Sequence, residues 1–436
     1  MADAPFHGGE RGSDDFAGNA RPNAWREGIL RMNPNGSAPI LGLSSMGASK
    51  KVPDAKFTIF QKDLPAYGGA VSSCYESVVD GTPTTEWAVG DTGAIGSLVY
   101  AQCAALVAAN FKPGDNVNLV DKDNPSRLSF GEVVSQEQNG ASSYVTVILR
   151  DTPTIAHLYY ADYIHSVGSA YGEGEYAPDA IAYDPEELWN YTQIFRESLK
   201  LTRTAMETKL RTGDAYKEAK LDAFNKHTIA IEMATLWGRR YKTTASNGEP
   251  KRYTRGLWQF ITENSPADNV VDISAEAADG IDWELFGEDA INENIEKIAR
   301  WASSVGMKAF CGSKALLGIQ KLALINGNFE LKSSTDSYGI RLKKWNTPFG
   351  FEMDLITHPL MTQHEYMRNM IFFVRPQDLS WRFITDTKFM KSNEMNDGGH
   401  EGYDGKREGF LTEGGWEMQF PKRMAYWYNV GNDGSA

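Results

Sequence analysis

The stretch "LDAFNKHTIAIEMATLWGRR", residues 221–240, decides the fold because it predicts one long helix in the middle of the chain. It contains no proline, and its single glycine, Gly238, comes near the end. Asp214 is a good N-cap residue, so we expect the helix to begin there and to continue to about Lys242. At 1.5 Å per residue such a helix is roughly 40 Å long.

The polar residues of this helix recur at steps of three and four and form one narrow stripe, made of Asn225, Thr228, Glu232, Thr235 and Arg239. The rest of its surface is apolar, and other elements must cover it. The side chains that we expect to pack in this way are Phe224, Ile229, Ile231, Met233, Leu236 and Trp237. The pattern predicts a stiff spine helix that is buried on most sides.

Length and charge narrow the class of protein. The chain has 436 residues, of which 41% are hydrophobic, and this is enough for roughly two to four compact units. Its formal net charge is −13, which argues against a protein that grips nucleic acid, because phosphate binding depends on lysine and arginine. Cys74, Cys103 and Cys311 are odd in number and widely spaced, so we expect reduced thiols and no disulfide framework or zinc site.

Targeting signals are not apparent either. The first residues, "MADAPFHGGERGSDD", lack the basic start and apolar stretch of a signal peptide. The longest apolar run, "SLVYAQCAALVAANF", is shorter than the roughly 20 residues that cross a bilayer. We therefore expect a soluble protein that is made in the cytoplasm and does not enter a membrane.

Composition divides the chain into four parts. Residues 1–50 are rich in Gly, Asn, Ser and Pro, and we expect an N-terminal arm whose scattered hydrophobic residues lie across a neighbouring subunit. These residues are Trp25, Ile29, Leu30 and Ile40. Residues 51–175 alternate apolar and polar positions around turns and predict an extended or barrel-like insertion, with a hairpin at Asn139-Gly140.

The spine helix belongs to residues 176–255. Residues 256–436 predict a helix, a strand and a helix, followed by two strand pairs, the second of which turns at Pro376. Gly306 is expected to stop the first of these helices and Ser313 to cap the next. The fold class that results is α+β.

Short motifs do not indicate catalysis. "FCGSKALLG" places Gly, Ser and Lys at a strand-to-helix turn, but the order and spacing differ from a phosphate-binding loop. "GDTGAIG" lacks the spacing of a dinucleotide loop, and "GLSSMG" misses the nucleophile-elbow pattern by one residue. We therefore expect no catalytic residue and no cofactor.

Metal binding is not indicated either. The acidic stretch at 393–409 gathers oxygen ligands but lacks the alternate spacing of a calcium loop, so a solvated loop is favoured. His358 and His364 are separated by a proline and are expected to be satisfied histidines at a strand end or surface.

The order of particular phrases along the chain resembles the major capsid proteins of tailed bacteriophages with the Hong Kong 97 fold. The phrases are "RPNAWREGILRMNPNGSAPILGLSSM", "FTIFQKDLPAYGGAV", "YGEGEYAPDAI", "NYTQIFRESLKLT", "EMATLWGRR", "FCGSKALLGIQKLA" and "YGIRLKKWNTPFGFEMDLITHPLM". The resemblance covers about residues 21–430.

The resemblance implies an N-terminal arm at 1–50, an extended loop with a strand-rich insertion at 51–175 and a peripheral domain with the spine helix at 176–255. It implies an axial domain at 256–436, from which the chain returns to the peripheral domain. Pentamers and hexamers would build an icosahedral shell around double-stranded DNA, with a separate scaffolding protein, a portal and a decoration protein as partners. A tail or baseplate protein and an encapsulin-type compartment shell are the alternatives.

Overall fold

The structure is a computed structural model. It describes residues 48–62, 67–91, 93–151, 157–174, 184–208, 214–274, 283–301, 306–326, 332–333, 342–346, 349–350, 352–391 and 405–431. These residues form two compact units, and each is described by itself. The barrel unit is Phe60–Glu186, and the main unit comprises the described residues up to Ile59 and from Glu187 onward.

The barrel unit is built from seven strands and two short helices. In spatial order the strands are β4 (Thr82–Glu86), β3 (Gly68–Val79), β5 (Leu98–Cys103), β8 (Tyr144–Leu149), β7 (Leu128–Glu137), β6 (Asp115–Val120) and β9 (Tyr163–Ser169). An additional pairing of β3 with β9 closes the sheet. The helices are α1 (Ala105–Ala108) and α2 (His157–Tyr160).

Alternation of buried and more exposed positions, which is clearest in β5, explains how this sheet closes around a core. Val99, Ala101 and Cys103 of β5 are buried, whereas the residues between them are more exposed. The predicted hairpin at Asn139-Gly140 is confirmed, because β7 and β8 pair in antiparallel fashion around it. The barrel unit spans Phe60–Glu186, whereas the sequence predicted an extended or barrel-like insertion at 51–175. β2 (Lys56–Gln61) and β10 (Glu186–Tyr191) pair where the chain enters and leaves the unit.

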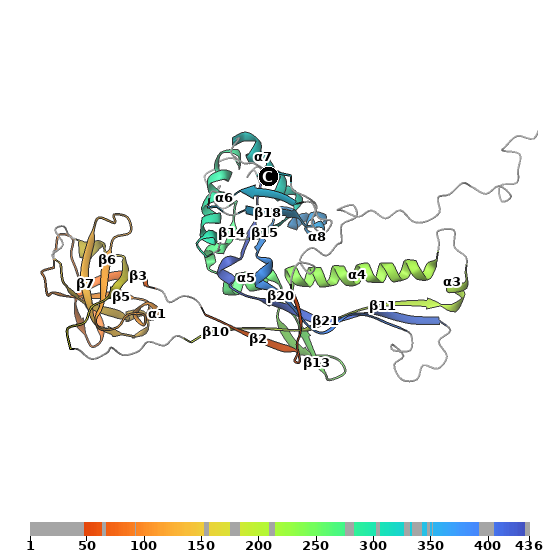
Figure 1. Cartoon of the computed structure of the whole chain (residues 1–436), viewed down its shortest axis with the longest axis horizontal. Coiled ribbons are helices and arrows are strands. Elements are labelled where there is room, and N and C mark those ends of the chain that lie inside the picture. The colour runs from red at the N-terminus through yellow and green to blue at the C-terminus, as the bar shows by residue number, and fades with distance from the viewer. Residues whose placement is uncertain are drawn as a thin grey trace, which may run out of the picture. The chain divides into compact units, whose positions relative to one another are not determined.

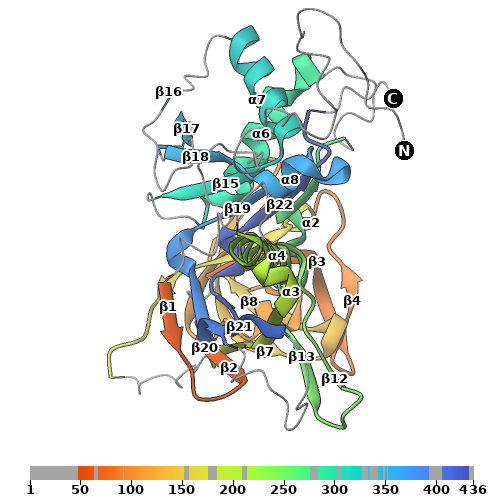
Figure 2. The same cartoon turned by 90° about the vertical axis from the view of Figure 1, so that its right-hand side faces the viewer.

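The main unit contains a four-stranded sheet that carries the long helix α4 (Ala215–Trp237). Its strands are, in spatial order, β1 (Ala48–Lys51), β20 (Leu379–Met390), β21 (Gly405–Met418) and β11 (Gln193–Thr202). β20 and β21 form a long antiparallel ladder, and β1 joins β20 in parallel. Figures 1 and 2 show α4 running along β11 and β21, with the short helix α3 (Arg203–Glu207) at its far end.

A mixed seven-stranded sheet forms the other layer of the main unit. Its strands are, in spatial order, β14 (Val270–Asp272), β22 (Ala425–Tyr428), β19 (Ile371–Val374), β15 (Met307–Cys311), β18 (Glu352–Thr357), β17 (Leu342–Asn346) and β16 (Lys332–Ser333). The remaining helices and strands are α5 (Leu257–Asn264), α6 (Trp283–Ala299), α7 (Ser313–Asn326), α8 (Pro359–Gln363), β12 (Tyr241–Thr244) and β13 (Pro250–Tyr253).

The two faces of this sheet belong to two different cores. Ala309 and Cys311 of β15 pack with buried residues of α6 and α7, whereas Phe310 between them packs with α5 and the end of α4. Burial on both faces gives these strands continuous apolar runs, such as "IFFV" in β19. The α+β class predicted from the sequence is confirmed.

Three expectations for this region were wrong. β19 and β20 were expected to pair around Pro376, but they lie in different sheets, because the short turn Pro376–Asp378 carries the chain from one layer to the other. α6 ends at Ala299 rather than at Gly306, and Ser313 is the first residue of α7 rather than its cap. The strand pair at β17 and β18 is confirmed as antiparallel.

Candidate functional site

The helix α4 is shorter than its sequence suggested. Its start is as predicted, because the Asp214 carboxylate accepts a hydrogen bond from the backbone N–H of Tyr216 at 2.9 Å. It ends at Trp237, and β12 begins only four residues later. The helix stops because Gly238 turns the chain, and its carbonyl accepts a hydrogen bond from the N–H of Gly256 at 2.8 Å.

The expected division between a polar stripe and a buried apolar surface was wrong. Thr228, Glu232 and Thr235 are 6%, 0% and 2% exposed, so much of the polar stripe faces the core. The two threonine hydroxyls donate to carbonyls of their own helix, Asn225 O at 2.8 Å and Ile231 O at 2.9 Å. Burial of these groups is tolerated because each of them has a hydrogen-bond partner.

The apolar residues expected along the spine have different environments. Ile231 and Leu236 are buried, while Met233 and Trp237 are partly buried and pack against the core that contains α5. Phe224 was expected to be covered but is 39% exposed, because only one side of its ring meets Phe410 of β21, at 5.3 Å between centroids. The arm residues Trp25, Ile29, Leu30 and Ile40 lie outside the described residues.

Two buried polar contacts join α4 to both sheets of the main unit. The Glu232 carboxylate lies 2.8 Å from Nε2 of His358, which directly follows β18, and both side chains are 0% exposed. The indole N–H of Trp416 in β21 donates to the Thr235 hydroxyl at 2.7 Å. The Glu232–His358 contact also shows that His358 is a buried strand-end histidine with a partner.

Immediately after α4, the antiparallel hairpin of β12 and β13 leaves the main unit from a closely packed base. Asn190 of β10 organises this base. Its amide group donates to Thr254 Oγ1, Arg255 O and Trp416 O at 3.1, 3.2 and 2.8 Å, and its carbonyl oxygen accepts from the N–H of Arg255 at 2.8 Å. We call Asn190, Gly238, Thr254, Arg255 and Gly256 the hairpin junction.

Two glycines allow the chain segments that lead into and out of the hairpin to approach each other closely at the hairpin junction. A Cβ at Gly238 would lie 2.6 Å from the carbonyl oxygen of Thr254, and a Cβ at Gly256 would lie 2.6 Å from the N–H nitrogen of Gly238. Both positions are closed to a side chain by rigid backbone atoms. No sequence pattern predicts this contact, because the two glycines are far apart in the chain.

Cations surround the junction. Arg240 lies over the ring of Trp189 at 3.8 Å and donates to its carbonyl oxygen at 2.9 Å. Arg255 is only 4% exposed, and burial together with the neighbouring Arg240 lowers its pKa to about 10, although Glu263 at 3.8 Å acts in the opposite direction. These cations hold the base of the hairpin against α5 and β10.

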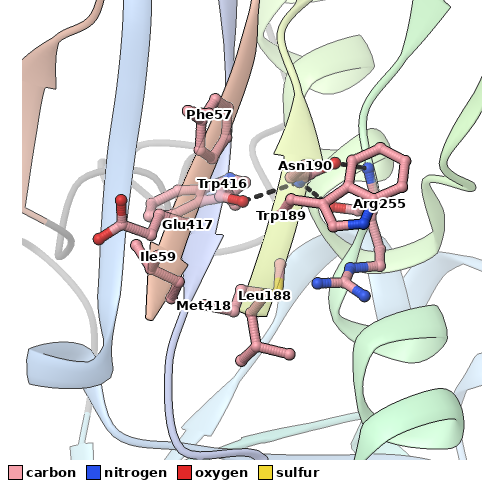
Figure 3. A pocket seen from close by; sticks show the side chains of 9 residues that line it. All are labelled: Phe57, Ile59, Leu188, Trp189, Asn190, Arg255, Trp416, Glu417 and Met418. Atoms are coloured by element: carbon pink, nitrogen blue, oxygen red, sulfur yellow. Dashed lines mark hydrogen bonds between the residues drawn. The ribbon is translucent and has the colours of Figure 1, made fainter. Parts of the chain in front are cut away.

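A small pocket lies beside the junction, as Figure 3 shows. It is lined by Phe57, Ile59, Leu188, Trp189, Asn190, Arg255, Trp416, Glu417 and Met418. Its enclosed space is about the size of one water molecule, which is too small for an organic cofactor. The pocket is therefore a packing feature of the junction.

The acidic stretch and the cysteines, which the sequence offered as possible ligands or reactive groups, form no reactive or metal-binding site among the described residues. Most of the acidic stretch 393–409 lies outside the described residues; of its carboxylates, Glu408 is described, and it accepts a hydrogen bond from the Tyr216 hydroxyl at 2.5 Å. This bond raises the pKa of Tyr216 to about 12. The three cysteines are buried and free. Among the described residues no group of His, Cys, Asp or Glu is arranged to hold a metal ion.

The candidate site thus consists of buried contacts that lock a long helix and a projecting hairpin to two sheets. No helix within the described parts of the chain is long and apolar enough to span a bilayer. Among the described residues these contacts form no assembled set of nucleophile, base and orienting group.

The chain belongs to the SU10 major capsid protein family, whose model matches residues 13–430. It is therefore a phage major capsid protein with a structural role, and not an enzyme.

Individual relatives are more distant. The major capsid protein of Pseudomonas phage PaMx41 is 24% identical over 339 residues, which cover 77% of this chain and 72% of that protein. Among solved structures, the capsid of an empty GTA particle is 10% identical and covers 96% of this chain and 97% of the other, with a TM-score of 0.44. The holo-SrpI encapsulin complex of Synechococcus elongatus PCC 7942 is 11% identical, with coverage of 58% and 78% and a TM-score of 0.37. The family assignment rests on the family model.

Proposed function

We propose that this capsid protein assembles as pentamers and hexamers into the closed icosahedral shell that encloses the double-stranded DNA of a tailed phage. The observation that carries the proposal is the match of a major capsid protein family model to nearly the whole chain. Neither a tail or baseplate protein nor a compartment shell is supported by that match. Closed shells of this kind are built from symmetric rings with head-to-tail interfaces.

The contacts of the spine helix support this function. A shell subunit must transmit load between its neighbours without bending, and a well-packed interior has low compressibility. α4 is joined to the four-stranded sheet through Thr235 and Trp416, and to the seven-stranded sheet through Glu232 and His358. A mechanical load on either sheet of the main unit is therefore transmitted to α4.

The charge of the chain suits a container for DNA. With a net charge of −13, the wall as a whole repels the phosphate backbone, so packaged DNA remains free to enter and leave. We propose that the enclosed DNA is not recognised by sequence. Assembly takes place in the host cytoplasm and the mature subunit resides in the virion capsid.

The N-terminal arm is proposed to connect neighbouring subunits. Trp25, Ile29, Leu30 and Ile40 would each contribute about 1.5 to 3 kcal/mol on burial, before the cost of ordering the arm is subtracted. A separate scaffolding protein, a portal and a decoration protein complete the proposed set of partners. The domain roles expected from the resemblance, an arm, an extended loop, a peripheral domain and an axial domain, are part of this proposal.

Electron microscopy of the purified full-length protein, alone and co-expressed with the neighbouring phage genes, tests the function. We expect closed particles of uniform size. A protein that stays monomeric or dimeric under every condition of salt and co-expression would contradict the proposal.

Deletion of residues 1–45 tests the arm. We expect circular dichroism and a cooperative thermal transition close to those of the full chain, together with the loss or instability of shells. A truncated chain that is unfolded would show that the arm belongs to the subunit core, and one that builds stable shells would show that the arm is dispensable.

A further inference from the structure

The β12–β13 hairpin is strongly basic within an acidic protein. Residues 239–255 contain six basic residues and one acidic residue, Glu249, which gives a net charge of +5. Since the whole chain carries −13, the remainder carries −18. The basic residues are Arg239, Arg240, Lys242, Lys251, Arg252 and Arg255.

Like charges face each other in the β12–β13 ladder, in the second residue pair from its base. Lys242 and Arg252 are direct cross-strand partners, and therefore project from the same face. Direct opposition of like charges destabilises a strand pair. Neither side chain forms an ion pair with a carboxylate in the described parts of the chain. The pair raises the free energy of the isolated subunit, and a nearby anion would remove that cost.

Within the described parts of the chain, the strands of the hairpin are covered only in part, where β13 meets β11 near the base. β12 and β13 form a two-stranded sheet of their own, and such a sheet is marginally stable without further packing. Lys242 and Lys251 are exposed, and Tyr241 is 62% exposed. Its ring lies 6.2 Å from that of Tyr253, directly across the hairpin. The hairpin therefore offers Tyr241, Tyr253 and Lys251 on one face, and Lys242 and Arg252 on the other.

The base of the hairpin is rigid, in contrast to its exposed outer part. The hairpin junction fixes both strands through Asn190 and through the close contact of Gly238 with Gly256. Arg240 is held further by Trp189 and by Gln259, whose side-chain oxygen accepts a hydrogen bond from the N–H of Arg240. A projecting element with a fixed base and an uncompensated charge is suited to dock on a partner, because little conformational freedom is lost on binding.

We propose that the β12–β13 hairpin docks on a carboxylate-rich surface of a second copy of this chain, with Lys242 and Arg252 as the side chains that meet the carboxylates. This proposal rests on the proposed shell function and names a partner surface for it. We choose a second copy as the partner because of charge complementarity. The chain outside the hairpin has a net charge of −18, and in a shell every hairpin is surrounded by other copies. The DNA phosphate backbone is the competing anion, and the experiments distinguish the two.

The first experiment uses the double variant Lys242→Gln/Arg252→Gln in the full-length chain. The matched control is Lys217→Gln/Lys226→Gln, which removes the same charge from exposed positions on α4. Assembly is followed by light scattering and electron microscopy over a range of protein concentrations, and the thermal transition is measured on unassembled subunits.

We expect the hairpin variant to melt at the same temperature as the wild type or higher, because the repulsion is gone. We also expect it to need about tenfold more protein to begin assembly. The control should match the wild type in both measurements. An unchanged or higher melting temperature combined with weaker assembly would indicate docking. If the two residues only stabilised the subunit, the melting temperature and the ability to assemble would both decrease.

The second experiment identifies the partner group. A carbodiimide joins a lysine amine to a carboxylate only when the two are in contact. In particles assembled from mixed ¹⁴N- and ¹⁵N-labelled subunits, we expect Lys242 to be joined to an Asp or Glu of another copy. Lys251 lies on the opposite face of the hairpin, with Tyr253, and should give fewer such cross-links. Lys242→Arg should keep normal assembly and lose the cross-links made by residue 242.

Several results would overturn the proposal. One is a hairpin variant that assembles at the wild-type concentration, and another is the absence of any cross-link from Lys242 to a different copy. Normal shells that retain less DNA would assign the hairpin to phosphate instead. If the wild type and the control both fail to assemble, the shell function itself fails; failure confined to the hairpin proposal leaves wild-type shells intact.

Discussion

The barrel unit and the spine helix bury different kinds of residue in the same chain. The interior of the barrel is apolar, and Val145, Val147 and Leu149 of β8 are all 0% exposed. The core-facing side of α4 includes His227, Glu232 and Thr235, while Leu221 on the same helix is 44% exposed. The barrel core is thus mainly apolar, with a few buried polar residues such as Ser129 and Thr146, whereas α4 uses buried polar groups to bind its neighbours.

The difference follows from the neighbours that each element has. A closed sheet satisfies its backbone within itself, so its interior needs only apolar side chains of suitable size. α4 lies between two sheets, and side chains from both reach it with hydrogen-bonding groups of their own, such as the Trp416 indole and the His358 ring. Polar contacts of this kind fix one orientation of the helix, whereas apolar packing alone permits several.

The largest expected effect comes from breaking the helix. Ala230 is exposed in the middle of α4, so Ala230→Pro acts on the backbone alone, by removing a hydrogen bond and by a clash with the preceding turn. We expect a loss of about 3 kcal/mol or more in the free energy of unfolding of the main unit. Limited proteolysis should cleave the main unit before the barrel unit.

Ala230→Leu is the control and should leave stability close to that of the wild type. Wild-type solubility and thermal stability of the proline variant would show that residues 215–237 are not one continuous helix in solution.

The next prediction compares the loss of stability caused by truncating a buried leucine with that caused by truncating an exposed one. Leu119 is 0% exposed in the barrel, and Leu221 is 44% exposed on α4. We expect Leu119→Ala to lower the free energy of unfolding by about 2 to 5 kcal/mol, and Leu221→Ala to change it by less than about 0.5 kcal/mol in the unassembled subunit. Urea titration with separate reporters for the two units measures both. Equal losses would mean that the outer side of α4 is covered.

A smaller effect isolates one polar contact of the spine. Thr235→Val keeps the shape of the side chain and leaves the Trp416 indole N–H buried without its acceptor, at a cost of about 1 to 3 kcal/mol. Thr228→Val is the matched control, since the Thr228 hydroxyl donates to a carbonyl of its own helix. Chemical denaturation should rank the control as the milder change. If Thr228→Val proved the more destabilising change, the Thr235–Trp416 hydrogen bond would not be important for the position of the helix.

The smallest expected effect is a pH dependence. His227 is 1% exposed and lies 2.7 Å from the Thr412 hydroxyl, and burial lowers its pKa below its ordinary value. The unfolded state, with a histidine pKa of about 6.5, therefore binds a proton first as the pH falls. Stability from this group is complete above about pH 6.5 and is lost as the pH falls toward the folded pKa. His227→Gln should reduce the decline in melting temperature between pH 7 and pH 5. If the decline is unchanged in this variant, other titratable groups cause it.

Local patterns determined a good part of this molecule. The alternation of the segment around Asn139-Gly140 was enough to predict its hairpin, because the period of a strand separates its two faces. The start of the spine at Asp214 followed from capping chemistry. Its end did not, because Gly238 stops the helix through a contact with Gly256 that no local pattern records.

The α+β class, the existence of the long helix and the resemblance to a capsid protein family could be predicted from the sequence, since these depend on residue periods and on the order of segments. Which side of the helix is buried depends on the tertiary structure, because Thr235 and Glu232 can be buried only where Trp416 and His358 supply their partners. The tertiary structure also places β19 and β20 in different sheets, and sets Lys242 opposite Arg252 on a hairpin with a rigid base. Each of these depends on the register and distance between segments far apart in the chain, which no local pattern contains.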